Sequence, residues 1–126
     1  MRIAFNAKQG IFDVDAHALI CSLSGTDVDE HEHYLMLQRS PEGTQTDEDW
    51  GVHLEFDDQI NGDYGAVHRC RLSRDHLHVD LSRQLGSLSG VEGFDVSLDI
   101  DDSSFERIRA GLQRIFRDMP GALVIA

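Results

Sequence analysis

Residues 94–116 read FDVSLDIDDSSFERIRAGLQRIF, and this stretch decides the fold because two hydrophobic periods follow one another in it. From Phe94 to Ile100 every second residue is apolar, which is the pattern of a strand with one buried face. From Phe105 to Phe116 the apolar residues recur at helical spacing and form one stripe. A series of strands followed by a single amphipathic helix is typical of an α+β domain.

The sequence around this helix also predicts its limits. Ser103 followed by Glu106 has the spacing of a capping box, and the two acids at 101–102 lie where the helix dipole favours negative charge. Pro-Gly at 120–121 is expected to end the helix. The apolar tail at 123–125 is expected to add an edge strand or to cover the core.

Upstream of this stretch the alternation of apolar and polar residues recurs and predicts an antiparallel β-sheet of about six strands in a single domain, residues 1–126. The expected strands cover residues 2–6, 18–24, 32–39, 51–57, 64–72, 77–81 and 94–100. Polar segments at 40–49 and 86–93 are expected loops, as is 58–63, which contains the turn-forming pair Asn-Gly.

The predicted strands have one apolar face, and we expect the C-terminal helix to pack on that face. The opposite face should then be in contact with water. Nearly all its residues are acids or histidines, so it should be acidic. They are His53, Glu55, Asp57, His78, Asp80, Asp95 and Asp99.

The charge balance limits the partners of the chain. Eleven basic and 23 acidic residues give a formal net charge of −12. Phosphate backbones and anionic lipids repel such a domain, so we expect no direct nucleic-acid or membrane binding. A basic protein partner is favoured, although acidity also serves solubility alone. No apolar run resembles a signal peptide or a membrane span, which predicts a cytoplasmic protein.

No motif predicts a catalytic, cofactor or metal site. The segment DVDEHEH at 27–33 gathers carboxylates and histidines but lacks the spacing of a zinc or calcium motif, which favours a solvated acidic loop. Glu55 and Asp57 share a face, yet catalytic carboxylates need burial to shift their pKa values apart. Cys21 and Cys70 lie in apolar stretches and are expected to be buried free thiols.

Trp50 is the only tryptophan and follows three acids, so two interpretations compete. It is either an interface anchor with a charged rim or a side chain that seals the edge of the core. The first interpretation gives the predicted partner-binding residues. They are Asp47, Glu48, Asp49, Trp50, Glu55, Asp57 and Asp58.

Several stretches together resemble a known family. They are YLMLQRS at 34–40, GVHLEFDDQ at 51–59, YGAVHRCRLSRDHLHVDLS at 64–82 and the final acidic strand and helix. In this order they resemble immunity protein family ten of bacterial polymorphic toxin systems, over roughly residues 32–117. The most specific matches are Gly-Val-x-x-Glu-x-Asp-Asp-Gln at 51–59 and Leu-Ser-Arg-Asp at 72–75.

The resemblance implies a non-catalytic α+β protein that binds and neutralises a cognate toxin domain. An acidic inhibitor would complement a basic toxin. Two alternatives stay open at the level of sequence. One is a small metal-dependent or acid/base hydrolase that uses the His/carboxylate face of the sheet, and the other is a domain that associates with itself, for instance as a homodimer.

Overall fold

The computed structural model describes residues 1–126 and contains nine strands and one long helix, which confirms the α+β class. The strands are β1 (Arg2–Val14), β2 (Leu19–Thr26), β3 (Glu32–Arg39), β4 (His53–Phe56), β5 (Asp58–Tyr64), β6 (Val67–Ser73), β7 (His76–Leu81), β8 (Gly93–Leu98) and β9 (Leu123–Ile125). A short 3₁₀ turn, η1, covers Thr46–Glu48, and the helix α1 covers Asp102–Ile115. The helix is too short and too polar to cross a membrane.

All nine strands belong to one sheet, in the order β5-β4-β3-β2-β1-β8-β7-β6-β9. Most neighbours are antiparallel, but β1 pairs in parallel with β8, and β6 pairs in parallel with β9. The sheet is therefore mixed and larger than the antiparallel sheet of about six strands that the sequence predicted. The apolar tail at 123–125 was expected either to add an edge strand or to cover the core, and it forms the edge strand β9.

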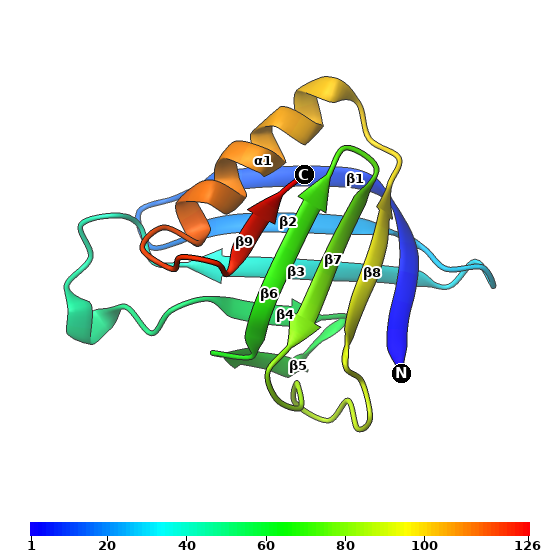
Figure 1. Ribbon diagram of the computed structural model, residues 1–126, viewed down its shortest axis with the longest axis horizontal. Helices are drawn as coiled ribbons and strands as arrows, with labels where there is room; N and C mark the ends of the chain where they lie inside the picture. Colours follow the sequence, from blue (N-terminus) through cyan, green and yellow to red (C-terminus); the bar gives the residue numbers. More distant parts are fainter.

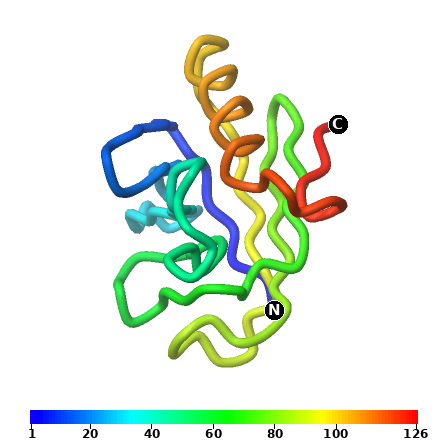
Figure 2. The backbone as a smooth tube through the Cα atoms, turned by 90° about the vertical axis from the view of Figure 1, so that its left-hand side faces the viewer, coloured from blue at the N-terminus to red at the C-terminus, as the bar shows by residue number.

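The sheet folds over on itself, so that β1–β5 form one layer and β6–β9 form another that crosses it (Figure 1). Phe56 of β4 and Phe94 of β8 have ring centroids 4.9 Å apart although three strands separate them in the sheet. The core therefore lies between the two layers. The helix contacts β1, β2 and β3 and lies along the top, between the layers (Figure 2). Its role is to close one side of a core that the sheet itself largely covers.

Strand β1 is the part of the chain that belongs to both layers. Its first half pairs with β8 and its second half with β2, with an irregular register between Ala7 and Gln9. At this bulge a Cβ atom on Gly25 would lie 1.7 Å from the carbonyl oxygen of Asn6, so only glycine fits. The sequence predicted only residues 2–6 here, because the bulge interrupts the alternation on which the prediction relied.

Three local predictions are wrong for physical reasons. The helix ends at Ile115 and not at the Pro-Gly pair 120–121, because Phe116 is its C-cap and Asp118 adopts a left-handed backbone with φ 58°. The helix begins two residues earlier than a Ser103 cap requires, because the Asp101 carboxylate accepts a hydrogen bond from the Ser104 N–H at 2.7 Å and acts as the N-cap. Residues 58–63 are not a loop but most of β5, which pairs with β4 through a turn at Asp57 with φ 63°. As an edge strand, β5 tolerates polar residues that would be costly inside a sheet.

The predicted core is confirmed. The inward residues Leu54, Phe56, Leu77, Val79, Phe94, Val96 and Leu98 and the helix stripe Phe105, Ile108, Leu112, Ile115 and Phe116 are all buried. The helix stripe packs mainly on β1–β3, however, and not over β4, β7 and β8 as predicted. Cys21 and Cys70 are buried free thiols, as expected, and burial raises the pKa of Cys21 to about 12.

Replacing Leu112 by Ala should lower the free energy of unfolding by about 2–5 kcal/mol, because it removes a fully buried side chain and leaves a cavity. Urea denaturation followed by circular dichroism measures this change. The matched control is Gln113→Ala, next to it on the exposed side of α1, which should change stability by no more than about 0.5 kcal/mol. Equal midpoints for the two variants would contradict the packing described here.

Candidate functional site

A buried arginine fixes the loop that carries the predicted partner-binding residues. Arg39, at the end of β3, is only 7% exposed. Its Nη1 donates hydrogen bonds to the carbonyl oxygens of Ile115, at 3.0 Å, and Arg117, at 2.8 Å, which have no partner within the helix. Its Nη2 donates to the Asp49 carboxylate at 3.0 Å. The loop is therefore tied to the C-terminal end of α1.

Asp49 serves this internal contact and is not a free surface charge. The hydrogen bond from Arg39 holds the pKa of Asp49 below its ordinary value, against the opposing effect of burial. Arg117 lies within 3.6 Å of the same carboxylate. Of the three acids before Trp50, only Asp47 and Glu48 are exposed and make no ion pair.

Trp50 is 71% exposed, so it does not seal the core edge. Its ring packs edge-on against Tyr64 of β5, with centroids 5.6 Å apart, and Tyr64 in turn packs against His53. Beside the pair is a groove of about 430 Å³. The groove is lined by Ser40, Asp47, Glu48, Trp50 and Tyr64. We call these five residues the Trp50 groove.

Tyr64 was missed in the sequence because its contact with Trp50 depends on the pairing of β4 with β5. The prediction placed residue 64 at the start of the next strand. In the structure Tyr64 ends β5 and lies opposite His53, at the start of β4. A two-residue alternation cannot show which neighbour an edge residue meets.

Asp57 and Asp58 lie at the other end of the β4–β5 hairpin. Six residues, including all of β4, lie between Trp50 and Asp57, and at roughly 3.3 Å per extended residue they span about 20 Å. Asp58 is exposed and makes no ion pair. The seven predicted residues therefore do not form one compact patch.

Asp57 takes part in a bridge centred on His33. Nδ1 of His33 lies 2.6 Å from the Asp57 carboxylate and Nε2 lies 2.7 Å from the Asp27 carboxylate. Burial lowers the pKa of His33, but the two carboxylates outweigh it and raise the pKa above its ordinary value. The hydrogen bond with His33 lowers the pKa of Asp27 to about 2. We call these three residues the His33 bridge.

Glu55 was expected to face solvent, and this prediction is wrong. It is 7% exposed and accepts a hydrogen bond from the Tyr34 hydroxyl at 2.6 Å. This hydrogen bond, together with burial, raises the pKa of Tyr34 to about 12. The sequence could not show that Tyr34 of β3 reaches across to β4. Glu55 accepts from the Tyr34 hydroxyl, whereas Asp57 accepts from the Tyr34 backbone N–H and contacts His33, so the two carboxylates serve different contacts.

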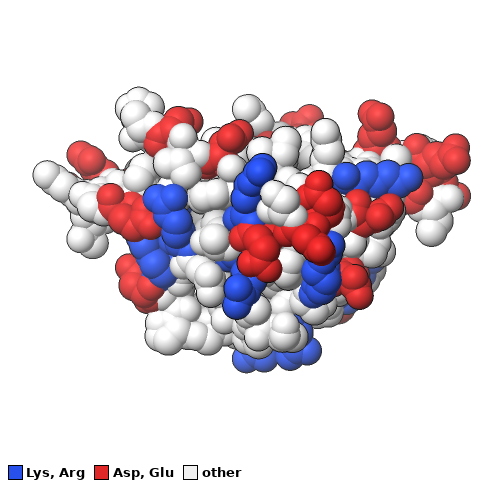
Figure 3. Space-filling view, turned by 90° about the horizontal axis from the view of Figure 1, so that it is seen from above, with Lys and Arg blue, Asp and Glu red and all other residues white.

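The acidic residues are unevenly distributed over the surface. On the side that carries α1, arginines and acids are interspersed, and the acids gather mainly at the end occupied by the β2–β3 turn (Figure 3). That turn contributes Asp27, Asp29, Glu30 and Glu32. On the outer face of the other layer, Arg2 pairs with Asp80 and Asp95. The expectation of a uniformly acidic sheet face is therefore too simple.

Comparison with protein-family models identifies a family for most of the chain. The family model described as Immunity protein 10 matches residues 6–106, from β1 to the first turn of α1. This range includes the Trp50 groove and the His33 bridge. No curated protein matches the chain.

Replacing His33 by Gln should remove part of the pH dependence of stability. Because the folded-state pKa of His33 is raised, its stabilising contribution is fully present below the ordinary value near 6.5 and is lost as the pH rises through the folded-state pKa. Unfolding free energies of both proteins, measured from about pH 5.5 to 8.5, should converge toward alkaline pH. The control is His68→Gln, an exposed histidine outside the bridge, which should keep the wild-type profile. A constant difference between wild type and His33→Gln across this range would contradict the assignment.

Proposed function

The chain belongs to the immunity protein 10 family, and on that premise we propose that it is a non-catalytic inhibitor that binds and neutralises a cognate toxin domain in the cytoplasm. Membership of an immunity protein family implies a toxin-neutralising role and a protein partner. The proposal adds a surface, the Trp50 groove, and a charge preference for a basic toxin domain.

The observation that carries the choice of surface is the exposed aromatic pair of Trp50 and Tyr64. An exposed tryptophan packed against a tyrosine provides a large, rigid apolar area, and such residues dominate the affinity of many interfaces. Asp47 and Glu48 lie beside this pair with no internal ion pair. An aromatic centre with a charged rim is the usual anatomy of a protein interface.

The rigidity of the groove also supports the proposal. Arg39 holds Asp49 on one side of Trp50, and the Gly51 N–H donates to the Asp49 carboxylate at 3.1 Å. The Trp50 backbone is therefore positioned before any partner arrives. A pre-formed site loses less conformational freedom on binding, which increases affinity for a given contact area.

The acidic charge of the chain should mainly raise the rate of association with a basic toxin domain. A domain with net charge −12 attracts a basic partner over several ångströms, and Asp47 and Glu48 are free to direct that attraction to the groove. Asp58 and Asp57, about 20 Å away, are proposed to extend the contact along the β4–β5 hairpin.

The double variant Asp47→Lys with Glu48→Lys should slow association with the toxin domain encoded beside this chain, by roughly tenfold at low salt. The loss should shrink at molar ionic strength, where the Debye length falls to about 3 Å. Stopped-flow or surface-based kinetics at two salt concentrations measure both effects. Asp49 is left unchanged, because replacing it would leave the buried Arg39 with only the exposed Asp118 as a carboxylate partner.

The control for the charge change is Asp29→Lys with Glu32→Lys, which alters net charge equally at the β2–β3 turn. If this control slows association as much as the Asp47/Glu48 double variant does, net charge, and not the Trp50 groove, governs the encounter.

Replacing Trp50 by Ala should speed dissociation of the complex, by a factor equivalent to about 2 kcal/mol or more. Because the side chain is exposed, thermal stability of the free protein should change little. Dissociation rates from chase experiments, paired with melting curves, separate the two effects. A complex whose lifetime is unchanged by this substitution would place the binding surface elsewhere.

A further inference from the structure

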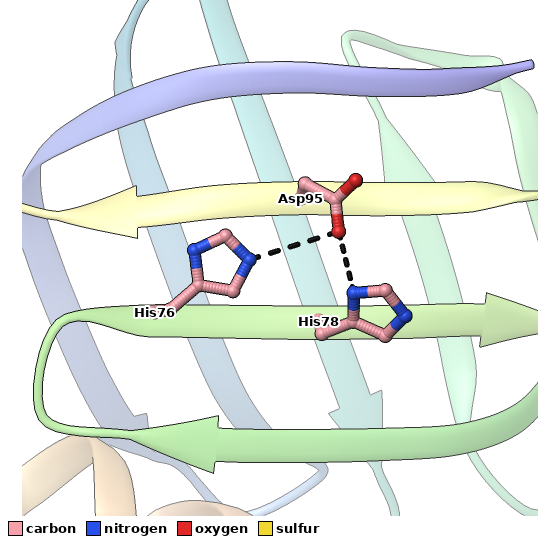
Figure 4. A group of neighbouring side chains, drawn as sticks. All are labelled: His76, His78 and Asp95. Carbon is pink, nitrogen blue, oxygen red and sulfur yellow. Dashed lines mark ion pairs between the residues drawn. The ribbon is translucent and has the colours of Figure 1, made fainter.

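A cluster of potential metal ligands lies on the outer face of the second layer, away from the Trp50 groove. It consists of His76 and His78 of β7 and Asp95 of β8 (Figure 4). The two histidines are two residues apart on a strand, so their side chains lie on the same face. His78 is directly opposite Asp95 in the register of the sheet. One nitrogen or oxygen atom from each residue lies within 4.8 Å of the others.

One carboxylate oxygen in this cluster lacks a hydrogen-bond partner. Oδ2 of Asp95 accepts a hydrogen bond from Nε of Arg2 at 2.9 Å, whereas the buried Oδ1 has none. Nδ1 of His78 lies 2.5 Å from Oδ1, but the contact lacks the geometry of a hydrogen bond, and Nε2 of His76 lies 3.6 Å away. Two imidazole nitrogens therefore converge on Oδ1 at ion-pair distances without a hydrogen bond of good geometry, and a cation between the three atoms would give each of them a partner.

The other nitrogen of His78 has the partner that a metal-bound histidine usually has. Nε2 of His78 lies 3.1 Å from the Asp80 carboxylate, which leaves Nδ1 with a free lone pair when Nε2 carries the proton. Arg2 donates to Asp80 at 2.8 Å and to Asp95, and so holds both carboxylates in place. Arg2 neutralises only one of these two carboxylates, so the three residues together keep one negative charge.

The cluster opens into a groove of about 540 Å³. His76 and Asp95 lie on one side of the groove, and Asp27, Val28 and Glu30 of the β2–β3 turn line it too. The groove leaves room for a solvent ligand. The two acids of the turn outnumber the one lysine in the lining, Lys8, which favours a cation.

We propose that this chain binds one zinc ion through Nε2 of His76, Nδ1 of His78 and Oδ1 of Asp95, with solvent from the groove as the fourth ligand. Two imidazoles and one carboxylate suit zinc, whereas calcium and magnesium prefer oxygen alone. Tetrahedral ligands at zinc lie about 3.3 Å apart, so a small rotation of the His78 ring opens the 2.5 Å contact for the ion.

This site was not predicted because its ligands are joined by strand pairing. The sequence has no zinc motif, and Asp95 lies far from His76 along the chain. The proposal is independent of toxin binding: it concerns the free protein and a different layer of the fold. Since the ligands meet only in the folded chain, zinc should stabilise it.

The test uses full-length protein freed of metal by a chelator and titrated with Zn²⁺ alone. Calorimetry should show one ion per chain, and saturating zinc should raise the melting temperature. Co²⁺ should give the visible absorption bands of a tetrahedral site. His76→Ala and His78→Ala should each weaken Zn²⁺ binding by about tenfold or more, since even loss of an outer-shell partner costs that much.

Two matched controls locate the ion. His68→Ala changes an exposed histidine outside the cluster, and His31→Ala removes a ligand from the group formed with Asp27 and Asp29 at the β2–β3 turn. Both should bind Zn²⁺ as wild type does. His76 is 43% exposed, so His76→Ala should fold, and it decides the outcome even if His78→Ala does not. The proposal is overturned if no saturable site is found, if His76→Ala binds as wild type, or if His31→Ala abolishes binding.

Discussion

The double pairing of β1 is the constraint on which the rest of the structure depends. This strand pairs with β2 on one side and with β8 on the other, and it bends at the bulge between Ala7 and Gln9. The bend lets one continuous sheet fold into two layers that bury a shared core. Because the core lies between the layers, a single helix is enough to close the remaining side. Any side chain at position 25 in place of Gly25 would disturb this bend, since it would collide with the Asn6 backbone.

Arg39 connects this core to the surface that we propose for toxin binding. Its guanidinium satisfies carbonyl groups at the end of α1 and the Asp49 carboxylate at once. A buried charge is tolerated only when it is paired and hydrogen-bonded, and here the pairing also fixes the loop before Trp50. The same contact therefore contributes to the stability of the helix end and to the position of the exposed aromatic pair.

The acidic residues behind the net charge of −12 fall into two groups. Some have partners within the protein, and the others are free at the surface. Asp49, Asp80 and Asp95 pair with arginines, and the His33 bridge uses two more carboxylates. Asp47 and Glu48 remain unpaired at the surface, beside the Trp50 groove. The proposed zinc cluster lies in the other layer, so toxin recognition and metal binding are expected to be separable functions of one domain.

The sequence by itself determined the α+β class, the presence of one C-terminal helix, the buried stripe from Phe105 to Phe116 and the limits of β3, because these depend on local hydrophobic periods. It also contained the family resemblance. Only the tertiary structure decided that Glu55 is buried against Tyr34, that Trp50 meets Tyr64, and that His76, His78 and Asp95 converge. The physical reason is the same in each case. A period of two places a side chain on one face of a strand, whereas its neighbours on that face come from strand pairing between distant segments, which local periodicity does not encode.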